Sequence, residues 1–189
     1  MVQADSLPDH QGQSPLPSSA ALLIVGGGIM GLWAALKADR LGIDTVLVDA
    51  GQTGSGASGG LLGALMPHMP DRWNDKKQFQ FDALLTLEDE IAQLEAETGM
   101  SAGYRRCGRI IPLPKPHLRP IAERHRQEAL TNWDQQGQRF HWHVLDAPPV
   151  ENWVDASAGQ AGFVHDTFAA KVSPRALVAA LAACLKASR

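Results

Sequence analysis

The sequence is short of cysteine, of net basic charge and of long apolar runs, and each shortage excludes a class of protein. Its two cysteines, Cys107 and Cys184, lie far apart, which indicates neither a disulfide framework nor a zinc cluster. The formal net charge of −3 makes nucleic acid an improbable partner. No apolar run is long enough to span a bilayer, and the amino terminus lacks the basic start of a secretory signal. We therefore expect a cytoplasmic protein without a membrane or nucleic-acid partner.

Glycine, in contrast, is abundant, and three consecutive glycines follow an apolar segment. Residues 20–25 form an apolar run typical of an interior strand of a parallel sheet. After the glycines, a one-sided apolar stripe predicts a helix from residue 29 to 41, stopped by Gly42. Residues 43–48 form a second apolar strand, which Asp49 closes. The order is strand, glycine turn, helix, strand and acid.

Each residue type in this order suits the binding of a dinucleotide. The first glycine allows a tight turn, the second lets a pyrophosphate approach the main chain, and the third lets the helix pack closely against the strands. The free N–H groups at the start of the helix attract phosphates, and the acid after the second strand can accept both hydroxyls of an adenosine ribose. The predicted binding residues of this unit are Gly26, Gly28, Ile29, Met30, Gly31 and Asp49.

The segment after the acid, residues 51–64, indicates which dinucleotide is bound. It is rich in glycine, alanine and hydroxyl side chains and too poor in large residues to pack a core. Its main-chain N–H groups and hydroxyls could lie against a flat ligand. A flexible linker is the alternative, but the apolar residues within the segment, such as Leu61 and Leu62, disfavour it.

With this segment, the sequence resembles the D-amino-acid oxidase-like family of FAD-dependent oxidoreductases, especially glycine oxidase-like members and the oxidase part of tRNA-modifying enzymes. The resemblance is carried by the turn from Gly26 to Gly31, by Asp49 and by the segment from Ala57 to Ala64. It implies that residues 55–58 lie near the pyrophosphate of FAD and residues 60–62 border the flavin ring. The residues that it adds to the predicted site are Ser55, Gly56, Ala57, Ser58, Gly60, Leu61 and Leu62.

The resemblance also implies a fold, an α/β protein with a Rossmann-like FAD-binding βαβ unit and part of an α+β substrate domain. It covers only the first half of such an enzyme, so we expect a truncated chain, or half of a split protein whose partner is the C-terminal half. The predicted parts are a disordered tail at 1–19, an FAD-binding core with the flavin loop at 20–75, a long helix at 76–103, a partial substrate-side sheet with one helix at 104–172 and a returning helix at 173–189.

Within these parts, hydrophobic periodicity and breaker residues predict the remaining elements. The predicted helices span residues 76–98, 117–136 and 174–189, and the predicted strands span 104–111 and 139–145, with a hairpin of 162–165 and 167–172 around Asp166.

Histidines are the remaining candidates for chemistry. His141 and His143 share a face of the predicted strand 139–145, but the sequence offers no third ligand nearby, so we predict no metal site. His68 lies in a proline-broken loop that would suit a position near a bound ring, yet an ordinary loop histidine is the simpler interpretation. The family's substrate-binding residues usually lie in the missing half. We therefore assign no catalytic residue.

The resemblance implies FAD-dependent oxidation of a C–N bond in a small amine or amino acid, by hydride transfer to the flavin. Two alternatives stay open. A NAD-dependent dehydrogenase would share the glycine turn and the acid. A non-catalytic or split-protein fragment that binds nucleotide would share them as well.

Overall fold

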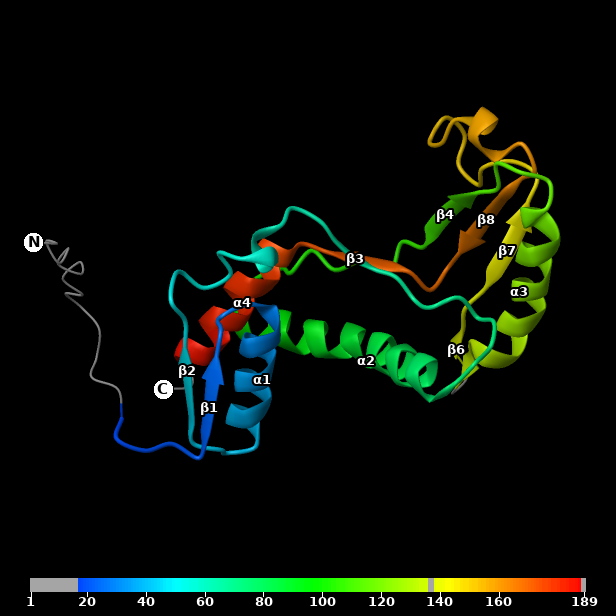
Figure 1. Ribbon diagram of the computed structural model, residues 1–189. Helices are drawn as coiled ribbons and strands as arrows, with labels where there is room; N and C mark the ends of the chain where they lie inside the picture. Colours follow the sequence, from blue (N-terminus) through cyan, green and yellow to red (C-terminus); the bar gives the residue numbers. More distant parts are fainter. Residues whose placement is uncertain (1–16, 136–137, 188–189) are drawn as a thin grey trace, which may run out of the picture.

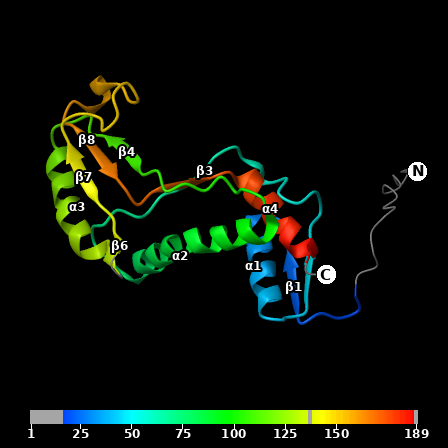
Figure 2. The ribbon, with the colours of Figure 1, turned by 180° about the vertical axis from the view of Figure 1, so that it is seen from behind.

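The computed structural model describes residues 17–135 and 138–187, so most of the predicted tail, residues 1–16, lies outside the described residues. Two parts of the molecule are joined by one long helix (Figure 1, and from behind in Figure 2). The helices are α1 (Ile29–Arg40), α2 (Asp75–Thr98), α3 (Leu118–Asn132) and α4 (Pro174–Ala187). The strands are β1 (Leu22–Val25), β2 (Thr45–Val48), β3 (Gly63–Leu65), β4 (Arg109–Pro112), β5 (Asp134–Gln135), β6 (Gln138–Arg139), β7 (Trp142–Leu145), β8 (Phe163–Asp166) and β9 (Ala170–Val172).

The first part is the predicted strand–helix–strand unit. β1 and β2 pair in parallel, with Leu22 opposite Thr45 and Val25 opposite Val48. α1 begins after Gly28 and is followed by Gly42 at φ +68°, which confirms the predicted stop. α4 packs against α1. The core of this part includes Leu32, Leu36, Ile91, Leu94, Leu177 and Leu181.

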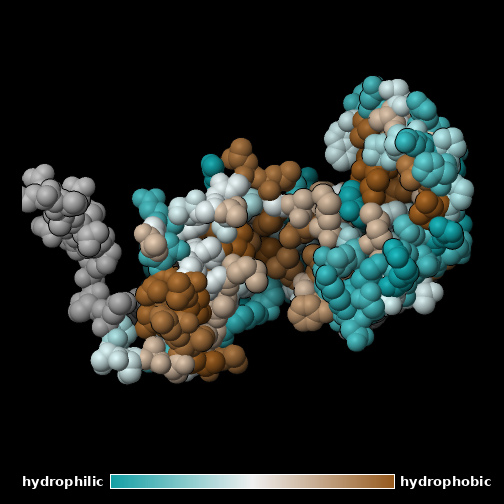
Figure 3. All heavy atoms as spheres, viewed as in Figure 1, coloured by the Kyte–Doolittle hydropathy of each residue, from teal (hydrophilic) through white to brown (hydrophobic). Residues whose placement is uncertain are grey.

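The sequence predicts that β1 is an interior strand, but one face of the β1–β2 sheet is exposed. Among the described residues β1 has β2 as its one neighbour, and the side chains of Leu23 and Val25 are 61% and 79% exposed. Figure 3 shows the resulting apolar surface over β1 and β2, coloured brown at the left. The apolar run therefore forms the predicted strand, but much of its apolar surface faces outward.

Helix α2 links the two parts, because its ends are buried in different cores. The side chain of Asn74 accepts a hydrogen bond from the Lys77 N–H at its start, and Gly99 at φ +67° ends it, so the predicted helix is confirmed. Phe81 near the first end packs into the second part, whereas Ile91 near the other end packs against α1 and α4. This helix therefore fixes the position of one part relative to the other.

The second part is an antiparallel sheet in the order β4-β8-β7 with α3 packed against β7. Gly108, at φ +73°, interrupts the predicted strand 104–111, so that β4 begins at Arg109. α3 ends at Asn132 instead of near residue 136, because Trp133 is fully buried and β5 begins at the next residue. The core of this part is aromatic and includes Phe81, Trp133, Trp142, Phe140 and Phe168.

The predicted hairpin around Asp166 is wrong. β8 pairs with β4 and β7, whereas β9 pairs with β3 in a separate sheet. The cause is the Asp166 carboxylate, which is fully buried and accepts hydrogen bonds from the N–H groups of Phe168 at 2.8 Å and Ala169 at 3.0 Å. Arg109 donates to the same carboxylate at 2.6 Å. These bonds turn the chain out of one sheet and into the next.

No helix within residues 17–135 and 138–187 is long and apolar enough to cross a membrane.

Replacing Asp166 by alanine should destabilise the protein strongly, because Arg109 and two buried N–H groups lose their partner at once. Breaking a buried ion pair on one side costs about 3–5 kcal/mol. Glu123→Ala, which removes an exposed pair with Arg126, is the matched control and should cost about 1 kcal/mol or less. Urea unfolding measures both free energies. Equal losses in the two variants would show that Asp166 does not hold the turn.

Candidate dinucleotide-binding site

The glycine turn lies where β1 passes into α1, at one edge of the parallel sheet. Gly26 has φ +110°, a backbone conformation that side chains disfavour, and its N–H donates to the Val48 carbonyl at 2.7 Å. Gly28 is the N-cap residue of α1 and has an ordinary φ of −78°. The turn itself therefore requires glycine at residue 26. The backbone conformation at Gly28 would suit any residue.

The other glycines differ in what a side chain would meet. A Cβ on Gly31 would lie 1.9 Å from the Gly26 carbonyl oxygen, so the helix approaches the turn only because this residue is glycine. A Cβ on Gly28 would lie 3.1 Å from the Ser58 hydroxyl oxygen. Gly31 therefore lets the helix approach the turn, and Gly28 lets the loop that carries Ser58 lie close to the start of the helix.

Asp49 joins the two strand ends. Its carboxylate accepts hydrogen bonds from the Gly27 N–H at 2.5 Å and the Gly51 N–H at 2.7 Å. These two N–H groups lower the pKa of Asp49 from its ordinary value of 3.8, so the exposed carboxylate is ionised at neutral pH. Each carboxylate oxygen can accept further hydrogen bonds, as the hydroxyls of a ribose would require.

The loop after Asp49 folds back over the glycine turn. The Ser58 hydroxyl accepts a hydrogen bond from the Ile29 N–H at 3.0 Å, and Ala57–Gly59 form a short 3-10 turn there. The Gly54 N–H donates to the Gly27 carbonyl at 2.9 Å. Ser55 instead lies on the Asp49 side of the loop, because its hydroxyl is 3.5 Å from the Cβ position of Gly51. The two predicted serines therefore lie at different ends of the site.

Contacts from α4 hold this loop, and the sequence patterns did not reveal them. The Arg175 side chain donates to the Gly59 carbonyl at 2.6 Å. Gly54, at φ +74°, packs so closely that a Cβ would lie 2.7 Å from Val178. The glycines of the loop were a signal of close packing, but nothing in the sequence identified the helix that packs there.

The apolar residues predicted to border a ring are well exposed. Leu61 and Leu62 are 79% and 70% exposed, and Met30 at the start of α1 is 82% exposed. Exposed apolar side chains beside a polar turn are suited to a ligand with a charged end and a flat apolar end.

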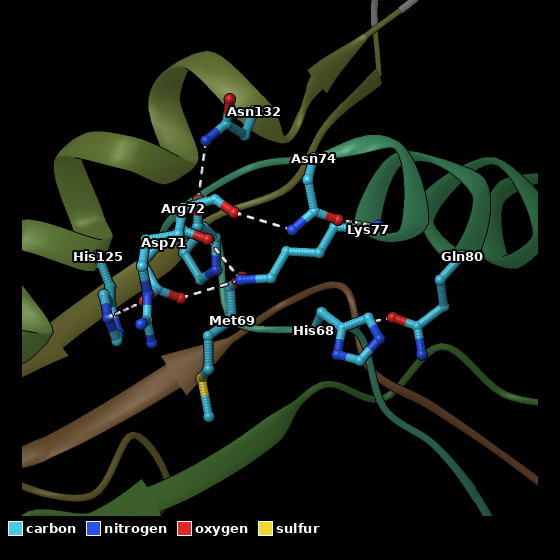
Figure 4. A network of polar contacts seen from close by, with 10 residues as sticks. His68, Met69, Asp71, Arg72, Asn74, Lys77, Gln80, His125 and Asn132 are labelled. Carbon is cyan, nitrogen blue, oxygen red and sulfur yellow. Dashed lines mark hydrogen bonds and ion pairs between the residues drawn. The ribbon is translucent and has the colours of Figure 1, made fainter.

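The loop between β3 and α2 is anchored by a polar network (Figure 4). The Lys77 ammonium donates to the Met69 carbonyl at 2.8 Å and pairs with the Asp71 carboxylate at 3.0 Å. His125 of α3 lies 3.8 Å from the same carboxylate. The His68 N–H donates to the Gln80 side chain at 2.7 Å, so α2 positions this histidine through its backbone. The network therefore fixes the backbone at His68.

A parallel strand pair with a glycine turn, a helix that starts at that turn and an acid at the neighbouring strand end has the arrangement of a Rossmann-type strand–helix–strand unit. The model of the FAD dependent oxidoreductase family (DAO) matches residues 21–188, and the chain belongs to this family. No curated protein matched the sequence.

Solved structures share the fold at low sequence identity. Glycine oxidase from Geobacillus kaustophilus superposes with a TM-score of 0.72 at 20% identity, over 89% of this chain and 45% of that chain. L-Amino acid deaminase from Proteus myxofaciens, solved with anthranilate, gives 0.72 at 16% identity, over 98% and 40%. Iminodiacetate oxidase from Chelativorans sp. BNC1 gives 0.69 at 20% identity, over 88% and 44%. The chain thus spans less than half the length of each.

Gly31→Ala should destabilise the protein far more than Gly28→Ala. The added methyl group at Gly31 would overlap a backbone carbonyl, which cannot move without opening the turn. Overpacking costs about 1–3 kcal/mol or more, and this overlap should reach the upper end. At Gly28 the methyl group meets only the Ser58 hydroxyl, and the cost should be below about 1 kcal/mol. Thermal and urea unfolding compare the variants, and equal stabilities would show that the helix does not need its close approach.

Proposed function

We propose that this chain binds FAD and forms the nucleotide-binding part of an oxidoreductase that oxidises a C–N bond in a small amine or amino acid. The main support is one observation. Hydrogen bonds bring the start of α1, the Asp49 carboxylate and the Ser58 hydroxyl together around the glycine turn. Membership of the FAD-dependent family favours FAD over NAD as the dinucleotide.

The residues present fit the pyrophosphate of FAD. A side chain at Gly28 would crowd the Ser58 hydroxyl beside the start of α1, so glycine would leave room there for a phosphate. The N–H groups of Ile29 and Met30 lie in the first turn of α1, where the helix dipole favours negative charge. The Ser58 hydroxyl now accepts from the Ile29 N–H, and its rotation would let it donate to a phosphate instead.

The ends of the site fit the ribose and the flavin. The ionised Asp49 would accept the ribose hydroxyls, with Ser55 on the same side of the loop. Leu61 and Leu62, after Gly60, would border the flavin ring and exclude water from it. α4 would keep this loop in place through Arg175.

When bound, FAD would supply the acceptor for a hydride from the carbon that carries the substrate nitrogen. The part of this chain is to hold and orient the cofactor. The substrate class is supported by the names of the similar structures, a glycine oxidase, an L-amino acid deaminase and an iminodiacetate oxidase.

We propose further that substrate-binding residues come from a polypeptide region equivalent to the remainder of those longer chains. The exposed apolar side of β1 would suit contact with that region. Both cysteines are free, which supports a reducing compartment such as the cytoplasm.

Asp49→Ala should weaken FAD binding about tenfold or more, because a charge-assisted hydrogen bond contributes about 1.5–3 kcal/mol. Quenching of flavin fluorescence on titration measures the affinity. Since its pKa is lowered, Asp49 stays ionised as the pH falls to about 5, and its contribution should persist over that range. An affinity that Asp49→Ala leaves unchanged would remove the ribose from this position.

Gly28→Val should abolish FAD uptake while the chain stays folded, because its backbone conformation suits any residue and the larger side chain would push aside the Ser58 hydroxyl and block the start of α1. Ala34→Val, on an exposed position of the same helix, is the matched control and should bind FAD normally. Circular dichroism confirms folding, and a parallel titration with NAD tests the alternative dinucleotide. Uptake of FAD by Gly28→Val equal to that of the control would overturn the proposed site, and preference for NAD would overturn the proposed cofactor.

A further inference from the structure

Arg175, the second residue of α4, contacts the loop that lies over the glycine turn. Its Nε–H group donates to the Gly59 carbonyl at 2.6 Å, across 116 positions of the sequence. A guanidinium carries five N–H donors in a planar fork. Within residues 17–135 and 138–187 the other four form no hydrogen bond and no ion pair, and Arg175 is exposed. The fold therefore uses one donor of this side chain and leaves the terminal nitrogens available.

The carbonyl that Arg175 contacts lies close to the start of α1. Gly59 and Ser58 are consecutive residues of the 3-10 turn Ala57–Gly59, and consecutive Cα atoms are about 3.8 Å apart. The Ser58 hydroxyl accepts from the Ile29 N–H, in the first turn of α1, at 3.0 Å. The start of α4 lies beside the same 3-10 turn (Figure 1). A guanidinium from α4 and an N–H group of α1 therefore both contact one short turn of the loop.

Close packing fixes the start of α4 against this loop. A Cβ on Gly54 would lie 2.7 Å from Val178, and a Cβ on Gly63 would lie 3.2 Å from Pro174. The Gly54 N–H also donates to the Gly27 carbonyl at 2.9 Å, within the glycine turn. The first turn of α4 thus has a fixed position relative to the proposed phosphate site.

The positive charge of Arg175 is unfavourable for α4 itself. A cation in the first turn of a helix meets the positive end of the helix dipole. The first turn of α4 contains no acid that would offset this charge, and neither does the first turn of α1. The bond to the Gly59 carbonyl requires only one N–H donor, which a neutral side chain could supply. A bound anion at the loop would compensate the charge.

We propose that Arg175 binds the pyrophosphate of FAD directly. Its Nε–H group would stay on the Gly59 carbonyl, and its terminal N–H groups would donate to phosphate oxygens. Arginine suits this contact because its planar fork can donate two parallel hydrogen bonds to a phosphate. This role rests on the proposed FAD site, and it adds to that site a charged side chain that the glycine-turn pattern does not contain.

The test is titration of the 189-residue chain with FAD and, separately, with ADP, which has the diphosphate but no flavin. Arg175→Ala should weaken the binding of both about tenfold at about 50 mM NaCl, and Arg175→Lys should restore part of the loss because an ammonium keeps the charge. Lys186→Ala removes an exposed cation from the other end of α4, so it is the matched control and should bind both nucleotides like the native chain. Circular dichroism checks that the variants are folded.

Salt separates a phosphate contact from mere support of the loop. Salt screens the pairing of exposed charges, so the difference in FAD affinity between the native chain and Arg175→Ala should fall to about threefold or less at about 1 M NaCl. The hydrogen bond to the Gly59 carbonyl involves a neutral acceptor and depends much less on salt. A loss of affinity caused only by displacement of the loop would therefore persist at high salt.

Two results would overturn the role of Arg175. One is an affinity of Arg175→Ala for both nucleotides equal to that of Lys186→Ala. The other is a loss that is the same at both salt concentrations, or one that Arg175→Lys does not reduce, because Arg175 would then only support the loop. A folded native chain that binds ADP with the salt-dependent contribution of Arg175, but does not bind FAD, would overturn the proposed cofactor and support the phosphate contact. Binding of neither nucleotide would overturn both proposals.

Discussion

The hydrogen bonds from the Gly27 and Gly51 main chain to Asp49 are the constraint on which the candidate site depends. They tie the end of β2 to the glycine turn after β1, so that a carboxylate and the start of α1 lie at the same edge of the sheet. Without this link the turn and the acid would be separate features of two strand ends. With this link, the negative Asp49 carboxylate and the positive end of the α1 dipole lie side by side at the proposed site.

Helix α2 extends this order to the rest of the molecule. Its first turns hold the loop after β3 through Lys77, and Phe81 joins the aromatic core of the second part. Its last turns pack with Leu94 against α1 and α4, and α4 in turn supports the loop over the nucleotide turn. The two parts of the molecule are therefore positioned by one continuous helix.

Local patterns predicted the strand–helix–strand unit and α2 well, because a glycine turn, a helix stripe and a stop residue such as Gly99 act over a few residues. Long-range pairing could not be predicted in this way. The bonds of Asp166 made β8 and β9 members of different sheets, and no pattern along the chain indicated that β8 pairs with both β4 and β7. The support of the loop by Arg175 was missed for the same reason.

The most direct test of the central claim is a ¹⁵N-resolved NMR titration of the full chain with FAD. We predict that the amide signals of Gly28, Ile29 and Gly51 shift first and saturate together, while amides on β7 and β8 stay unchanged. The common saturation would show that the turn, the helix start and the acid's loop contact one ligand. Shifts confined to other segments, or no shifts at all in the folded chain, would contradict the account.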